Sequence, residues 1–354
     1  MSPPPATSPG QLALRRLRRN PLAWFSISVL VVFSLAALFA YALAPDHTPG
    51  ANRQLPALAK LPPGSEVPVL VRQRQEPQPQ TSWVAGLLHG WPAATQLTPL
   101  ADSARLRISA DSIHFRHASG RPDVALLPAA LFRIDREAAF TQAALRETSK
   151  PYRLQGGRVR LVRHGHGRDT LSLAALAERR AALTRTLAFP LGTDPFGRDL
   201  LSRLLLGARI SLGVGTLAVF VSLSLGMVLG ALAGYFGGRV DAAVQWLMSL
   251  IWSVPSLLLA LVIAFALGRG LQTLALAVGL ATWVDLGRVV RGEILGLRER
   301  AFVAAARVMA FSPGRILRRH LLPNLTGPIA ILACANFATA ILLEAGLSFL
   351  GLGV

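Results

Sequence analysis

Five apolar segments of nearly bilayer length constrain this chain most. They are residues 21–44, 210–236, 242–267, 271–290 and 329–350. A helix needs about 20 apolar residues to cross the hydrocarbon core, where only helices and closed barrels satisfy every backbone group. Only 16% of the residues are charged, against about a quarter in soluble domains. We therefore predict an all-α polytopic membrane protein, and a large soluble core is the weaker interpretation.

The formal net charge of +19 has a topological explanation. Much of it lies in short arginine-rich segments beside apolar ones, where the positive-inside rule and anionic lipid account for it. No base-reading motif accompanies it, so we expect the lipid bilayer and no nucleic acid as partner. This charge pattern places the N-terminal tail, residues 1–20, in the cytoplasm. The single cysteine, Cys334, excludes a disulfide within the chain.

Residues 45–187 form a predicted extracytoplasmic α+β insert, strand-rich between Arg105 and Val162. RLRISADSIHFRH and YRLQGGRVRLVRHG alternate polar and apolar residues as half-buried strands do. The Pro- and Gln-rich residues 55–80 indicate an extended linker, and residues 171–187 an amphipathic helix. His164 and His166 suggest a metal site, but a turn between strands is favoured because no acidic or cysteine partner stands at ligand spacing. We therefore predict no metal site.

A basic stretch, AAARVMAFSPGRILRRHLLPN, runs from Ala304 to Asn324 between the last two apolar segments. Its alanines favour a helix and let another surface approach closely. Ser312-Pro313-Gly314 then breaks the helix before a second basic one. The residues alone leave two interpretations open: an arginine-anchored interfacial helix, or a short surface helix that transmits motion to the spans.

The same stretch resembles the EAA loop of ABC-importer permeases, E-A-A-x3-G-x9-I-x-L-P. Four residues match this pattern: Ala305, Ala306, Leu322 and Pro323. At three positions the chain differs, with Ala304 in place of the Glu, Ala310 in place of the Gly and His320 in place of the Ile. PLGTDPFGRDLLSRLLLGARISLGVG, SVPSLLLAL, LGRVVRGEIL and EAGLSFLGLGV are similar, in order, to C-type permeases of the dipeptide/oligopeptide/nickel family. RRNPLAWFSISVLVVFSLAALFA resembles their N-terminal span. The insert lies outside the resemblance.

This resemblance implies an ABC importer type I permease fold and a function in ATP-driven import of peptides or related small solutes. Residues 188–354 would be the permease core, with four further transmembrane helices and a cytoplasmic coupling loop at 291–323. The expected contacts to the ATPase are Ala304, Ala305, Ala306, Ala310, Gly314, His320, Leu322 and Pro323. The family continues past LGLGV with one more span, so we expect this chain to lack that helix.

The implied partners are a homologous B-type permease, two ATPase subunits and an extracytoplasmic binding protein, in a bacterial cytoplasmic (inner) membrane. No G-x-x-x-x-G-K-[ST] phosphate loop occurs in the sequence. The chain is therefore expected to be no enzyme and to bind no cofactor, with ATP and Mg on the partner ATPases. Peptides are the family's commonest cargo; nickel and glycosides also occur, and nothing here indicates a nickel site.

Four charged residues are candidates for a translocation path or gate: Glu344, Asp285, Asp194 and Arg198. Charges inside spans are costly and often functional. The structural alternatives are an i,i+3 pair of Asp285 with Arg288, a buried hydrogen-bonded Glu344, and a capped interfacial helix before the second span. Pro255 is predicted to kink the third span, residues 242–267.

Two other functions compete with the importer. A secondary transporter would need substrate and ion sites in one chain and usually internal repeats, and no convincing repeat is visible. A non-transport membrane scaffold or sensor would instead use the insert. Transport by the purified chain alone would distinguish a secondary transporter from a permease subunit.

Overall fold

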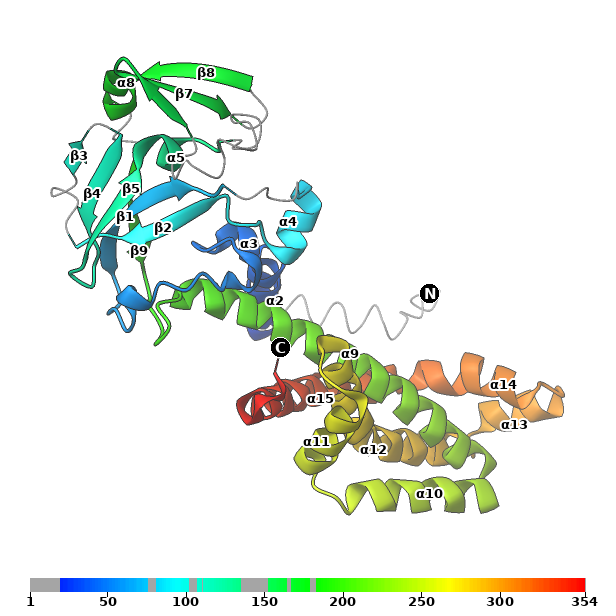
Figure 1. Cartoon of the computed structure of the whole chain (residues 1–354). Helices are drawn as coiled ribbons and strands as arrows, with labels where there is room; N and C mark the ends of the chain where they lie inside the picture. The colour runs from blue at the N-terminus through cyan, green and yellow to red at the C-terminus, as the bar shows by residue number, and fades with distance from the viewer. Residues whose placement is uncertain are drawn as a thin grey trace. The chain divides into compact units, whose positions relative to one another are not determined.

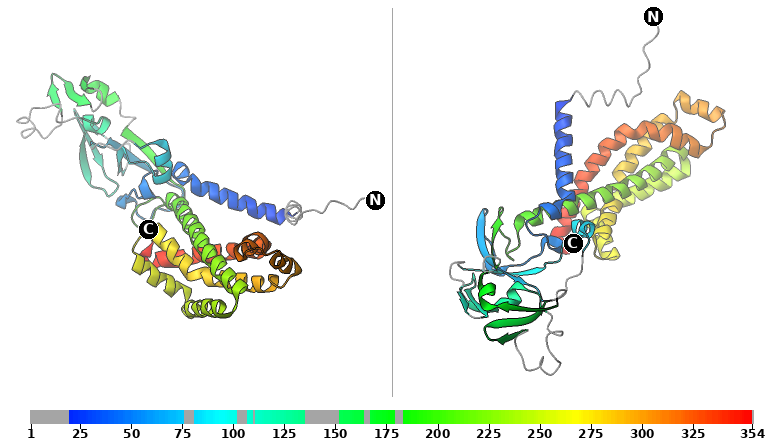
Figure 2. Two further views of the ribbon diagram at one scale, coloured as in Figure 1. Left: turned by 90° about the vertical axis from the view of Figure 1, so that its right-hand side faces the viewer. Right: turned by 90° about the horizontal axis from the view of Figure 1, so that it is seen from above.

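The computed structural model describes residues 20–75, 81–101, 107–109, 111–134, 152–163, 167–178 and 183–353, so residues 1–19 of the predicted tail lie outside it. The chain divides into two compact units, Met1–Gly207 and Ala208–Val354. Their elements appear in Figures 1 and 2. Helix α9 (Leu200–Phe236) begins in the first unit and continues through the second.

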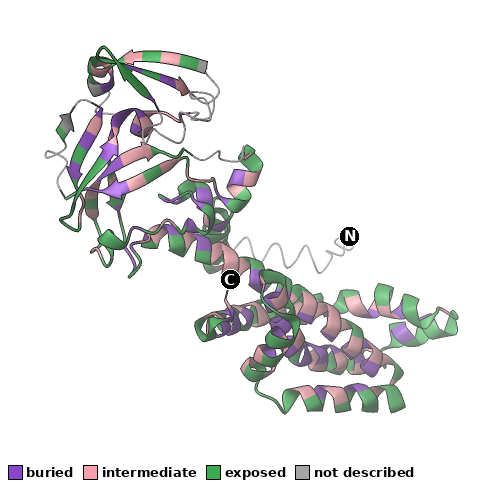
Figure 3. Ribbon diagram, in the orientation of Figure 1, coloured by how far each residue is buried: buried purple, intermediate pink, exposed green. Residues whose placement is uncertain are grey.

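The first described element of this unit is the apolar helix α2 (Pro21–Leu38), which is followed by the short α3 (Ala40–Leu43). The side chain of Asn20 caps α2 by accepting from the N–H groups of Leu22 and Ala23, and Pro21 occupies the first helical position, where its missing N–H costs nothing. Figure 3 colours the described elements by burial. Most residues of α2 are exposed, and the helix is long and apolar enough to cross a membrane. An all-round apolar helix of this kind suits a lipid environment.

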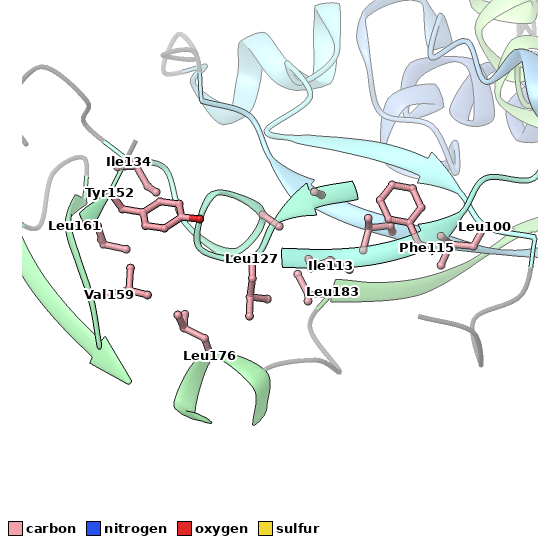
Figure 4. Packing of buried hydrophobic residues seen from close by; sticks show 13 residues of the cluster. Leu100, Ile113, Phe115, Leu127, Ile134, Tyr152, Val159, Leu161, Leu176 and Leu183 are labelled. Atoms are coloured by element: carbon pink, nitrogen blue, oxygen red, sulfur yellow. The ribbon is translucent and has the colours of Figure 1, made fainter. Parts of the chain in front are cut away.

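The described residues of the insert form three antiparallel three-stranded sheets with strand orders β2-β1-β9, β3-β4-β5 and β6-β7-β8. The strands are β1 (Ser65–Gln73), β2 (Thr95–Pro99), β3 (Arg107–Ser109), β4 (Ser112–Arg116), β5 (Pro122–Leu126), β6 (Arg153–Gln155), β7 (Arg158–Arg163), β8 (Gly167–Ser172) and β9 (Thr184–Phe189). Short helices α4 (Trp83–His89), α5 (Leu127–Leu131) and α8 (Leu173–Glu178) join them. Side chains from several of these elements form one apolar core, drawn in Figure 4.

Two expectations for the insert are wrong in detail. The predicted linker contains β1, and the predicted amphipathic helix at 171–187 is divided into the end of β8, the short α8 and the start of β9. Pro68 is tolerated in the middle strand of its sheet because it stands just outside the β1–β2 ladder, which starts at Val69, and its carbonyl still accepts from the N–H of Leu100 at 2.9 Å. Because β1 and β2 precede Arg105 and β8 and β9 follow Val162, the strands extend beyond the predicted range, Arg105–Val162, on both sides.

The second unit packs its helices around α12 (Leu271–Leu297), which carries more buried residues than any other described helix of the unit. The other helices are α10 (Gly238–Trp252), α11 (Ser256–Leu267), α13 (Ala301–Val308), α14 (Pro313–Ile316) and α15 (Thr326–Leu347). α9 runs for 37 residues, roughly 55 Å, which exceeds a bilayer core of about 30 Å. α12 continues to Leu297, so the first residues of the predicted loop 291–323 are helical.

A glycine row lets α9 approach the backbone of α12. A Cβ added at Gly226, Gly230 or Gly234 would lie 2.4–3.0 Å from backbone atoms of α12, with the closest approach, 2.4 Å, between position 230 and the carbonyl oxygen of Gly287. This spacing is the small-residue pattern of packed membrane helices. The segment GMVLGALAG therefore forms a tight helix–helix contact.

The predicted third span is broken rather than kinked. α10 and α11 meet at an angle of 92° across Ser253–Pro255. Pro255 has no N–H to continue the helix, and α11 starts afresh at Ser256. Within the described residues, four helices are long and apolar enough to cross a membrane, or five if the bent pair counts as one span.

Candidate functional site

A Schellman turn around Ala310 ends α13. The N–H of Phe311 donates to the carbonyl of Ala306 at 3.1 Å, and the N–H of Ala310 donates to that of Arg307 at 2.9 Å. Ala310 has a φ of 54°, the left-handed conformation that this motif requires and that normally selects glycine. The glycine position of the EAA pattern is thus the left-handed residue directly after the C-cap of α13, Met309, and the turn keeps its geometry with alanine.

The two faces of α13 differ in burial. Val303 and Ala306 pack into an apolar cluster with Ile294 of α12 and, further along, Ile316 and Leu321. Ala306 is only 1% exposed, so its side chain contacts its own chain. The opposite face leaves Ala304 and Ala305 exposed and, at the helix end, Val308 (87%) and Met309 (59%).

The second half of the loop is held by aromatic and apolar contacts. The ring of His320 stacks on Phe311 with centroids 6.0 Å apart, and the guanidinium of Arg315 lies 5.1 Å from the centre of the Phe311 ring. A π-helical turn, Leu317–Leu321, leads into a tighter turn, Leu322–Leu325, before α15. The predicted coupling residues therefore differ in access: Ala304, Ala305, Ala310, Gly314 and Pro323 are exposed, His320 and Leu322 are partly buried, and Ala306 is buried.

An ion pair that the sequence interpretation missed joins α10 to α12, the helix that leads into the loop. Arg291 of α12 donates from Nε and Nη2 to the two carboxylate oxygens of Asp241 in α10, at 2.5 and 2.7 Å. Arg298 donates to the carbonyl of Gly234 at 3.2 Å. Bidentate pairs of this kind fix geometry as well as supplying energy. The sequence does show a charged residue, Asp241, in the short turn GGRVD. Its partner Arg291 lies 50 residues further along the chain, so local spacing does not reveal the pair.

Glu344 is a buried, hydrogen-bonded carboxylate, 6% exposed. One oxygen accepts from the hydroxyl of Ser211 in α9 and the other from that of Ser348, both at 2.7 Å. Each carboxylate oxygen thus has a donor from its own chain. This arrangement ties α15 to α9 and fits the structural alternative.

Asp285 has a different environment from the one predicted. It is exposed on the otherwise largely buried α12 and accepts a hydrogen bond from the indole N–H of Trp252 at 3.1 Å. Arg288 lies over the Trp252 ring, 4.1 Å from its centre. No ion pair of Asp285 is present among the described residues. The expected pairing with Arg288 is therefore absent, because the tryptophan at the end of α10 holds that guanidinium.

Asp194 and Arg198 shape the turn before α9. Arg198 donates from Nε to Asp194 at 2.6 Å, and the N–H groups of Phe196 and Arg198 donate to the same carboxylate. Burial alone would raise the pKa of Asp194, but these hydrogen bonds outweigh it and lower the pKa below its ordinary value. Asp199 caps α9 by accepting from the N–H of Ser202 at 2.7 Å. The run fits a capped helix with internal pairs.

No metal-binding group is evident in the described ranges: nowhere do three His, Cys, Asp or Glu side chains lie close enough to hold an ion. His164 and His166 lie outside the described residues.

The comparisons with known proteins match two segments. Residues 226–354 match the family described as binding-protein-dependent transport system inner membrane component, and residues 8–63 match the N-terminal TM domain of oligopeptide transport permease C. The chain is 43% identical over 162 residues to the dipeptide transport system permease protein DppC of Alkalihalophilus pseudofirmus and 37% over 163 residues to the oligopeptide transport system permease protein OppC of Bacillus subtilis. Each match covers 46% of this chain and 53% of the relative, so the chain spans about half the length of these relatives.

Among solved structures, the inward-facing methionine ABC transporter MetNI is similar at a TM-score of 0.37 and 20% identity, over 41% of this chain and 72% of that one. The two family matches bracket the insert and confirm the resemblance seen in the sequence. The chain is a multi-pass membrane protein that carries a binding-protein-dependent transport system inner membrane component domain at residues 226–354 and an N-terminal TM domain of the oligopeptide transport permease C type at residues 8–63.

Proposed function

We propose that this chain is a permease subunit of an ATP-driven bacterial importer for peptides or related small solutes. It would work beside a homologous B-type permease, two ATPase subunits that hold ATP and Mg, and an extracytoplasmic binding protein. The proposal extends to this chain what the names of its relatives say of them, dipeptide and oligopeptide transport. The N-terminus and the loop 291–323 would lie in the cytoplasm, and the insert outside.

The observation that carries the proposal is the two-faced helix α13. Val303 and Ala306 anchor it to the unit's own core, while Val308 and Met309 point outward beside the exposed Ala305. Exposed apolar side chains that lie close together on a surface are typical of protein–protein contacts. Such a surface on a loop between two spans is well suited to enter an apolar cleft of an ATPase, and the small alanines allow close approach.

Cysteine cross-linking tests this docking. Cys334 is first replaced by alanine, because it is exposed. Single cysteines at Ala304 and Ala305 should then cross-link to cysteines placed in the docking cleft of the ATPase, with a yield that changes when nucleotide binds. Ala306→Cys is the matched control. It lies one residue further along the same helix with its side chain buried, and should react poorly.

The outcomes separate the competing functions. Absence of any cross-link at positions 304 and 305, together with normal transport by a bulky Ala305→Glu variant, would contradict docking and leave the loop as a lipid-surface anchor. Solute uptake by the purified chain in liposomes without partners would instead identify a secondary transporter. A chain that shows neither uptake nor ATPase contact would favour the scaffold or sensor.

A further inference from the structure

A cavity of about 410 Å³ opens in the second unit where the bent pair α10–α11 breaks. Its walls come from the break itself, from α12 and from α15. Most lining residues are apolar, but several polar side chains reach it: Trp252, Ser256, Thr282, Asp285, Asn336 and Thr339. A mainly apolar cavity with a few convergent polar groups is the usual form of a small-molecule site.

Asp285 is the acidic residue that lines this cavity, and its side chain is exposed. This exposure restricts the kind of surroundings in which the carboxylate can be stable. The residues around it in α12, from Ala281 to Val284 and again at Leu286 and Gly287, are buried. A carboxylate exposed to lipid in the middle of an apolar helix is costly, so this face must meet water, a solute or a protein. Its local hydrogen bond comes from a neutral indole, and the nearby Arg288 is held over that ring.

The carboxylate therefore has the capacity to accept a cation from outside the chain. Glu344, the other acidic candidate of the second unit, does not have this opening because serine hydroxyls occupy both of its oxygens. On the α15 wall, the amide nitrogen of Asn336 donates to the hydroxyl of Ser222 and the hydroxyl of Thr339 donates to the carbonyl of Ala335, so these two side chains offer their oxygens as acceptors. Ser256 is the first residue of α11, and no side chain caps the first N–H groups of that helix. Donors and acceptors of this kind match a peptide backbone next to a charged end.

We propose that this cavity binds the ammonium group of a transported peptide through Asp285 during its passage. The inference rests on the proposed importer function and adds to it the chemical class of the cargo, a solute with a free amino group. The apolar lining would receive small side chains, and the amide and hydroxyl groups of α15 would contact the peptide bonds.

The test uses the complete transporter in proteoliposomes, with trialanine as the probe. Asp285→Asn should lower kcat/KM for ATP-dependent trialanine uptake at least tenfold, and Asp285→Glu should retain part of it. Gln272→Ala is the control, because Gln272 is an exposed polar residue of the same helix that lies outside the loop 291–323 and does not line the cavity, and uptake should be retained. The amount of assembled complex is measured for each variant.

A second measurement does not depend on the aspartate. In the Cys334→Ala background, Thr339→Cys places a thiol in the cavity wall of the permease–ATPase complex. Trialanine should slow its alkylation, and N-acetyl-trialanine, which lacks the ammonium, should protect far less. Adding Asp285→Asn should abolish the difference between the two peptides.

The failures are distinguishable. If the unmodified complex takes up no peptide with ATP, the importer function fails and this inference with it. Trialanine uptake that is unchanged in Asp285→Asn, or equal protection of Thr339→Cys by both peptides, overturns the cavity site alone. A variant that loses the partner permease and shows no peptide protection at position 339 would assign Asp285 to the subunit interface instead.

Discussion

Replacing Ala310 by glycine should stabilise the loop after α13. Ala310 holds a φ of 54°, and a left-handed conformation costs an L-residue roughly 1–2 kcal/mol. Glycine removes that strain but adds about 0.4–1 kcal/mol of chain entropy to the unfolded state. The net gain is therefore about 0.5–1 kcal/mol, because the hydrogen bonds from Ala310 and Phe311 to Arg307 and Ala306 use backbone atoms only and are kept.

Hydrogen exchange with mass spectrometry measures this locally. Amides of the segment 304–316 should exchange about two- to fivefold more slowly in Ala310→Gly, since local opening becomes less favourable by that amount. Ala305→Gly is the matched control, because it places glycine inside α13, where it costs about 1 kcal/mol, and should speed exchange. Equal or faster exchange in Ala310→Gly would refute the strain argument and the Schellman geometry on which it depends.

Three further changes test other parts of the structure. Gly230→Ala should destabilise the protein in a thermal unfolding assay by about 1–3 kcal/mol, because the new Cβ would lie 2.4 Å from the carbonyl oxygen of Gly287. Gly213→Ala is the control: this position of the same helix has open space around it, and the substitution should be neutral or stabilising. Arg291→Ala should cost about 2 kcal/mol, and adding Asp241→Ala should recover part of it, because the unpaired carboxylate is then gone; additive losses would contradict coupling of the pair. Asp194→Asn should lower the melting temperature at pH 7, because a carboxyl with a lowered pKa contributes its full stabilisation above its unfolded pKa. The difference from the wild type should begin to shrink as the pH falls below about 4 and should be lost only as the pH drops through the lower folded pKa. A difference that persists unchanged at pH 3 would contradict that assignment.

The membrane helices were predictable because hydrophobic length alone determines them. The glycine row of α9 was also readable, since its spacing has one common use in membrane helices. The break at Pro255 was predicted only as a kink. Proline ends the hydrogen-bond ladder, but whether the two halves stay collinear depends on packing, and here they turn by 92°.

The details of the candidate site depend on contacts between residues far apart in the chain. Arg288 stands at the correct spacing to pair with Asp285, but Trp252, 33 residues before that aspartate, competes for both side chains. In the loop, the alanines form a continuous run, and the sequence does not say which of them faces the core. The helix direction and the Schellman turn bury Ala306 and leave Ala305 outside.

The loop and the cavity are connected through the same two helices. Ala306 and Val303 share one apolar cluster with Ile294 of α12 and with Leu325, the residue before α15. A displacement imposed on α13 by a partner would therefore act on α12 and α15 together, because close-packed cores transmit movement rather than absorb it. Asp285 stands on α12 roughly 18 Å before its end at Leu297, and Thr339 stands on α15. The two helices that carry the polar groups of the cavity, α12 and α15, thus share an apolar cluster with α13, the helix proposed to contact the ATPase. Docking of an ATPase at α13 can therefore change the shape of the cavity through packed contacts alone.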